Sequence, residues 1–139
     1  MLKFSLEFRM IWRLSLLNLI AVDDEKDVKV LFEHFFYQEV NDGDLNLFFE
    51  TSALDCLERL KNITGGQTIV LSDINMPGMN GIELLKEISR EYPEVKVILV
   101  SAYDQNRYFD EMQKWGAEGY ISKPVDFVAL KEKVFSLSI

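Results

Sequence analysis

The chain has little of what several protein classes need. Among its 139 residues there is one cysteine, Cys56, which excludes an intramolecular disulfide and a metal cluster held by several thiolates. Seven glycines and three prolines are too few for a collagen-like, proline-rich or glycine-rich disordered chain. The single histidine, His34, lies inside a helical pattern, so no hydrolase triad is indicated, and no glycine-rich Walker-type loop is present.

Positive charge and long apolar runs are also scarce. Lys and Arg number 15 against 23 Asp and Glu, a net charge of −8, so the phosphate backbone would repel the chain and we expect no direct nucleic-acid binding. No apolar run reaches the roughly 18–20 residues that a membrane span needs. The run over residues 14–22 is interrupted by Ser15 and Asn18 and has no cleavage site before the acidic residues that follow. We therefore predict a cytoplasmic protein without a membrane span.

What is present is an alternation of strand-like and helix-like patterns. Short apolar runs predict strands, and apolar residues at helical spacing predict the helices between them. Strands are predicted over residues 16–22, 45–49, 68–73, 95–100 and 120–121, and helices over 28–35, 53–60, 82–88, 104–115 and 125–137. Five strand–helix units predict an α/β fold, a doubly wound five-stranded parallel sheet flanked by five helices.

Conspicuous polar residues stand where four of these strands end. Asp23 and Asp24 follow the first strand, Asp73 ends the third, Ser101 follows the fourth and Lys123 follows the fifth. Because functional groups of such sheets gather at the carboxyl ends of the strands, we expect these five side chains to lie together. Three converging carboxylates repel one another unless a cation lies between them, and oxygen ligands suit Mg²⁺.

These groups suit phosphoryl transfer. Asp24 and Asp73 are the first candidates for metal ligands, Asp23 would act directly or through water, and a backbone carbonyl after Asp73 could complete the set. A carboxylate beside Mg²⁺ can attack phosphorus and form an acyl phosphate. The metal, the Lys123 ammonium and the Ser101 hydroxyl could each take one phosphoryl oxygen.

Four motifs, in order, carry a family resemblance. They are residues 22–25 (VDDE), 73–81 (DINMPGMNG), 101–102 (SA) and 116–124 (GAEGYISKP). Together they resemble the receiver domain of two-component response regulators, over about residues 16–137. The resemblance implies a flavodoxin-like sheet with strand order 2-1-3-4-5.

The resemblance assigns a role to each residue of the acidic site. Asp73 matches the aspartate that accepts the phosphoryl group. Asp23 and Asp24 match the acidic pair that holds Mg²⁺ together with Asp73, and Asn75 matches the position whose backbone carbonyl completes the metal site. The implied donor is a sensor histidine kinase or a histidine phosphotransfer protein.

The resemblance also implies how a signal would leave the site. Lys123 matches the catalytic lysine, and a cis bond is implied before Pro124. Ser101 matches the switch hydroxyl and Tyr120 the switch aromatic. The surface that changes would be the predicted fourth helix, fifth strand and fifth helix, through which a homodimer or a downstream protein could bind.

The first fifteen residues depart from the family pattern. We assign residues 16–139 to the receiver domain and residues 1–15 to an N-terminal extension. Apolar and polar residues alternate over residues 2–10, as in a strand, whereas Phe4, Phe8 and Trp12 share one helical face. Both patterns fit, and the sequence does not choose between them.

Two alternatives to a phosphorylated switch stay open at this point. A magnesium phosphohydrolase with an aspartyl intermediate often carries a second acid two residues after the nucleophile, but here that position is Asn75. We therefore expect no enzyme, only a receiver that catalyses its own phosphorylation and loses the phosphoryl group slowly. The other alternative is an interaction module that ignores phosphate.

Overall fold

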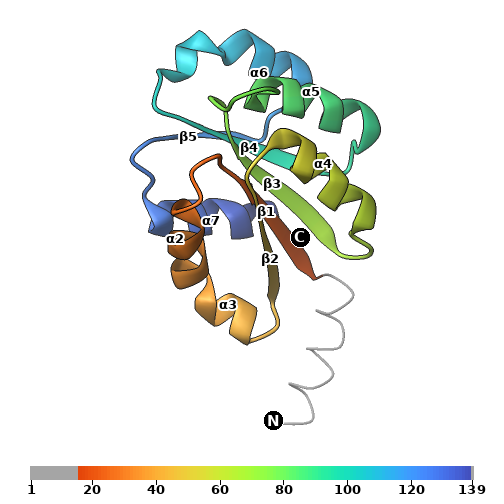
Figure 1. Cartoon of the computed structure of the whole chain (residues 1–139), viewed down its shortest axis with the longest axis vertical. Coiled ribbons are helices and arrows are strands. Elements are labelled where there is room, and N and C mark those ends of the chain that lie inside the picture. Colours follow the sequence, from red (N-terminus) through yellow and green to blue (C-terminus); the bar gives the residue numbers. More distant parts are fainter. Residues whose placement is uncertain (1–15, 139) are drawn as a thin grey trace.

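The computed structural model describes residues 16–138, and five parallel strands form its single sheet. The strand order is β2-β1-β3-β4-β5, which confirms the expected fold and order (Figure 1). The strands are β1 (Leu17–Val22), β2 (Leu45–Glu50), β3 (Gln67–Asp73), β4 (Lys96–Ser101) and β5 (Gly119–Ser122). All six residues of β1 are buried, as expected of a central strand covered on both faces.

Six α-helices and one 3₁₀ turn surround the sheet within residues 16–138. They are α2 (Val28–Phe35), α3 (Tyr37–Asn41), α4 (Ala53–Asn62), α5 (Gly81–Glu91), α6 (Phe109–Trp115), α7 (Phe127–Leu137) and the turn Gln105–Arg107. The expectation of five helices is therefore wrong by one. The extra helix arises because the first helical region is interrupted at Phe36, whose ψ of 9° departs from helical geometry.

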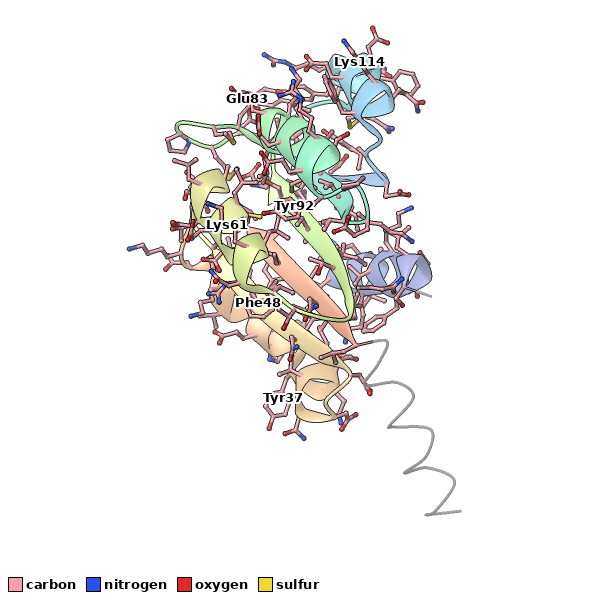
Figure 2. The ribbon with its side chains drawn as sticks, turned by 90° about the vertical axis from the view of Figure 1, so that its right-hand side faces the viewer. Tyr37, Phe48, Lys61, Glu83, Tyr92 and Lys114 are labelled. Carbon is pink, nitrogen blue, oxygen red and sulfur yellow. The ribbon has the colours of Figure 1, made fainter. Side chains whose placement is uncertain are left out.

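Two apolar cores lie on opposite faces of the sheet. One packs the sheet against α4, α5 and α6, and the other packs it against α2 and α7. Figure 2 views the molecule from the first of these faces, with Lys61 on α4 and Glu83 on α5. Covering both faces of a parallel sheet leaves its carboxyl-end edge as the natural place for polar groups.

Side-chain caps fix where the helices around that edge begin. Asn80 starts α5 with a capping box, in which its side chain accepts from the Glu83 N–H and the Glu83 side chain accepts from the Asn80 N–H. Asp126 caps α7 and Ser52 caps α4. These caps define the ends of the loops that follow β3, β5 and β2.

Two further expectations concern the chain outside this sheet. Within residues 16–138 no helix has the length and apolar character of a membrane span. The alternative patterns predicted for residues 1–15 lie outside the described residues.

Candidate functional site

The parallel sheet brings the predicted site residues to one edge. Asp73 and Ser101 are the last residues of β3 and β4, and Asp23 and Lys123 come directly after β1 and β5. The Lys123 N–H donates to the Ser101 carbonyl at 2.9 Å, which continues the pairing of β4 with β5 and places Lys123 beside the end of β4. The peptide bond between Lys123 and Pro124 is cis, as expected.

Three carboxylates meet at this edge. Asp23 and Asp73 are 8% and 5% exposed, Asp24 is exposed, and each contributes a carboxylate oxygen within 4.8 Å of the others. Among residues 16–138, Lys123 is the ammonium that approaches this group, so three negative charges meet one positive charge. A divalent cation would balance the remaining two, and an all-oxygen set suits a hard cation. The cluster therefore fits the metal site of a receiver domain.

Asp73 is held by two hydrogen bonds, one to each oxygen. Lys123 Nζ donates to Oδ2 at 2.7 Å, and the Asn75 backbone N–H donates to Oδ1 at 3.2 Å. Burial alone would lower the pKa of Lys123. The hydrogen bond to Asp73 and the charges of Asp73 and Asp23 outweigh burial and hold this pKa above its ordinary value. Lys123 therefore stays charged at neutral pH and fixes the position of the Asp73 carboxylate.

Burial is the main cause of the shifted pKa of Asp23. Burial raises its pKa above the ordinary range, although the Glu25 N–H, which donates at 2.9 Å, and the Lys123 charge both act in the opposite direction. Its Oδ2 lies 3.9 Å from Lys123 Nζ, a longer contact than the one Asp73 makes. A cation bound between the acids would favour the ionised form of Asp23.

Ser101 is fully buried, and its hydroxyl accepts two hydrogen bonds. One comes from the Asn75 side-chain amide at 3.3 Å and the other from the Tyr103 backbone N–H at 3.1 Å. The half-buried Tyr120 donates its hydroxyl to the carbonyl oxygen of the same Tyr103. Tyr103 thus joins the two predicted switch residues through its backbone, a link that the sequence pattern did not reveal.

The structure adds one feature that the sequence analysis missed. A pocket of about 340 Å³ opens beside Asp73 and Lys123, between α2 and the start of α7. Its walls are largely apolar and include Leu31 and Phe127. The only available signal was the apolar helical face of residues 28–35, which sequence analysis alone assigns to the core.

Comparisons with known proteins point to one family over most of the chain. The model of the response regulator receiver domain family matches residues 19–135. The chain is 34% identical over 119 residues to the DNA-binding transcriptional regulator NtrC of Escherichia coli strain K12, covering 84% of this chain and 24% of NtrC. It is 28% identical to the sporulation initiation phosphotransferase F of Bacillus subtilis, covering 84% of this chain and 90% of that protein.

Solved structures show the same likeness. A CheY-like response regulator receiver domain protein from Methanospirillum hungatei superposes with a TM-score of 0.76 at 27% identity, covering 88% of this chain and 93% of that one. Among curated relatives, the chain spans only 15% to 28% of the length of the first transcriptional regulators that it matches. Because the family model matches most of the chain, the protein belongs to the receiver domains of two-component response regulators.

Proposed function

We propose that Asp73 accepts a phosphoryl group in a Mg²⁺-dependent reaction and that the domain, residues 16–139, works as a signalling switch. One observation carries the proposal: the buried Asp73 carboxylate lies within 4.8 Å of the carboxylate oxygens of Asp23 and Asp24 and 2.7 Å from the Lys123 ammonium. A nucleophile, a cation site and a fixed positive charge are the parts that phosphoryl transfer needs.

Each residue has a role in the proposed reaction. An oxygen of Asp73 forms a bond to phosphorus while the bond from phosphorus to the donor breaks, and the Lys123 ammonium balances charge on a phosphoryl oxygen. Asp23, Asp24, Asp73 and the backbone carbonyl of Asn75 would hold Mg²⁺. The bound Mg²⁺ supplies charge neutralisation at the phosphoryl oxygens.

Ser101 would act after the transfer. Its hydroxyl must leave the hydrogen bonds with Asn75 and Tyr103 to reach a phosphoryl oxygen. Release of the Tyr103 backbone would then free Tyr120, whose hydroxyl bonds to the Tyr103 carbonyl. We assign Ser101 and Tyr120 as the switch pair on this basis.

The proposed donor is a sensor histidine kinase or a histidine phosphotransfer protein in the cytoplasm. Family membership supports this class of partner. Multiple turnover as a phosphatase is not part of the proposal, because Asn75 has no carboxyl group to transfer a proton to or from water. We expect slow autodephosphorylation at most.

The test is an intact-mass measurement after incubation with acetyl phosphate or phosphoramidate and Mg²⁺. One added phosphoryl group, absent from Asp73→Asn and absent without Mg²⁺, is the expected result. Continuous release of phosphate without an accumulating adduct would indicate a phosphohydrolase. No adduct at all would leave an interaction module that ignores phosphate, and either outcome would contradict the proposal.

A further inference from the structure

The pocket beside the acceptor carboxylate has largely apolar walls and a few charged residues. It measures about 340 Å³, and its apolar walls include Leu31 and Phe32 of α2 together with Val125 and Phe127. Asp73 and Lys123 line the same pocket. Small-molecule sites in proteins have this composition, with apolar walls and a few polar groups that orient the ligand.

The apolar wall is built from aromatic rings in mutual contact. The Phe127 ring stacks on Phe35 with centroids 4.5 Å apart and meets Phe32 edge to face at 5.3 Å. Phe32 is 5% exposed and belongs to the core, so this wall is anchored in the domain. Leu31 also lines the pocket and is 46% exposed.

The size and position of the pocket indicate what it can hold. An apolar cavity of about 150 Å³ is enough to bind benzene, so this pocket can take one aromatic ring. The charged residues of the lining are Asp23, Glu25 and Asp73 with the Lys123 ammonium, so the pocket opens directly onto the acceptor site. A ring held in it would be attached to the group that reacts with Asp73. That ring would belong to the leaving group of a phosphoryl donor.

We infer that the domain accepts a phosphoryl group from aromatic acyl phosphates in preference to acetyl phosphate. The inference rests on the proposed function of Asp73. With benzoyl phosphate, an Asp73 oxygen forms a bond to phosphorus, and the bond from phosphorus to the benzoyl oxygen breaks. The electron pair stays on that oxygen, so benzoate leaves as a carboxylate and neither a proton nor an oxidant is required. The benzoyl ring binds between Leu31 and Phe127.

The experiment compares the rates at which the two donors phosphorylate the whole chain with Mg²⁺, followed by intact mass. We expect benzoyl phosphate to react about tenfold faster per unit concentration, the discrimination that a hydrophobic pocket provides for a small apolar group. The two donors differ in intrinsic reactivity. The decisive quantity is therefore the rate with benzoyl phosphate divided by the rate with acetyl phosphate, compared between each variant and the parent. Leu31→Asn and Phe127→Ala should lower this ratio severalfold by slowing the reaction with benzoyl phosphate.

A matched control lies on the same helix. Val30 is 66% exposed and does not line the pocket, so Val30→Asn should leave the ratio unchanged. If Phe127→Ala proves unstable, Leu31→Asn still tests the pocket, because Leu31 is partly exposed and its replacement should leave the fold intact. A ratio unaltered by Leu31→Asn, with Asp73 still phosphorylated by acetyl phosphate, overturns this inference alone. Absence of an adduct from either donor overturns the proposed function and the inference with it.

Discussion

Lys123 is the side chain that joins the two buried carboxylates, and its exact shape matters as much as its charge. Lys123→Arg keeps the charge but replaces a compact ammonium, 2.7 Å from Asp73, with a larger planar group. We expect phosphorylation by acetyl phosphate to slow at least about tenfold while the fold is retained, because a displaced cationic group at position 123 stabilises the phosphoryl oxygens less well. Time-resolved intact mass and circular dichroism would measure the two effects.

The control for this variant is the same exchange at an exposed lysine. Lys61 pairs with the neighbouring Glu58 on the surface of α4, at 3.4 Å and away from the acidic cluster, so Lys61→Arg should phosphorylate like the parent. Equal rates for Lys123→Arg and the parent would show that Lys123 supplies charge without a specific position.

Asp24 is the exposed member of the acidic cluster, and it provides a test of the metal. Binding of Mg²⁺ to the folded state alone would stabilise the domain by about 1.4 kcal/mol when its concentration is ten times the dissociation constant. The thermal midpoint should then rise by about 5 °C. In Asp24→Ala this rise should be much smaller, while the metal-free midpoint should be unchanged or higher because repulsion between carboxylates is relieved.

Asp27→Ala is the matched control, because Asp27 is exposed, lies nearby and is outside the acidic cluster. It should keep the full effect of Mg²⁺. Coincident midpoints with and without millimolar Mg²⁺ in the parent would show that these carboxylates do not form a magnesium site.

Cys56 is predicted to be chemically silent. It is fully buried in α4, and burial raises the pKa of its thiol to about 12. The folded state thus keeps this proton at a pH where the unfolded chain, with an ordinary pKa of 9.0, has lost it. The protonated thiol therefore makes its full contribution to the free energy of unfolding below about pH 9, and this contribution is lost as the pH rises toward 12.

Iodoacetamide at about pH 8.5 should therefore alkylate folded Cys56 at least about 100-fold more slowly than the chain in concentrated urea. The matched control places a thiol at an exposed position of the same helix, Leu54→Cys in a Cys56→Ala background, since Leu54 is 66% exposed. That thiol should react quickly in the folded state. Similar rates for folded and unfolded Cys56 would contradict the burial.

The sequence predicted which residues belong to the site better than it predicted the contacts that those residues make. The motifs indicated Asp23, Asp73 and Lys123, because strand ends and residue types are local properties. They did not show that Ser101 bonds to Asn75 and Tyr103, since these contacts depend on side-chain conformations that the whole loop sets together. The roles of these residues stay predictions until the variants are measured.

At the scale of elements, the loop from β3 to α5 depends on the close approach of Gly81 to the backbone of Asp73 and Ile74. A Cβ at Gly81 would overlap the Asp73 carbonyl oxygen and lie 2.8 Å from the Cα of Ile74. Gly81→Ala should therefore cost about 1–3 kcal/mol of stability. It should also slow phosphorylation, because the backbone that must move carries Asp73 itself.

Gly43→Ala separates these two effects. A Cβ at Gly43 meets nothing within 4 Å, but its φ of 77° makes alanine costly by about 1–2 kcal/mol. This control should lose stability in chemical denaturation and still phosphorylate at the parent rate. If Gly81→Ala also phosphorylates at the parent rate, the close approach of Gly81 does not position Asp73.

The elements themselves were predictable where periodicity was clear. The strands of the sheet were found because a buried parallel strand reads as a short apolar run, and their order came from the family resemblance. The interruption at Phe36 was missed because no glycine or proline marks it. There the buried Phe36 ring stacks on Phe32, with centroids 6.2 Å apart, so tertiary packing decides the backbone. The helix expected over 104–115 begins instead with the 3₁₀ turn Gln105–Arg107, and here the cause is local: the Asp104 side chain caps that turn.

At the scale of the whole molecule, a change at Asp73 must reach the surface to act as a signal. Ser101 and Tyr120 both bond to Tyr103, so the loop after β4 connects the acceptor site to α6 and β5. Trp115 is the last residue of α6 and is half-buried against the core that lies between the sheet and α4, α5 and α6. The cationic groups of Lys86, Arg90 and Lys114 lie 5.2–5.9 Å from the centre of its ring. Its fluorescence should therefore report movement of α6.

Beryllium fluoride with Mg²⁺, a mimic of the phosphoryl group, should change Trp115 emission and promote self-association or partner binding through α6, β5 and α7. The measurement uses Trp12→Phe, so that Trp115 is the one tryptophan left. In the same background Ser101→Ala should still bind the mimic but lose the emission change, because the hydroxyl that starts the rearrangement is gone. The contrary outcome is that the mimic is shown to bind at Asp73 while Trp115 emission, sedimentation and amide exchange of residues 101–124 all stay constant. That result would show that the signal does not travel through Ser101 and Tyr120.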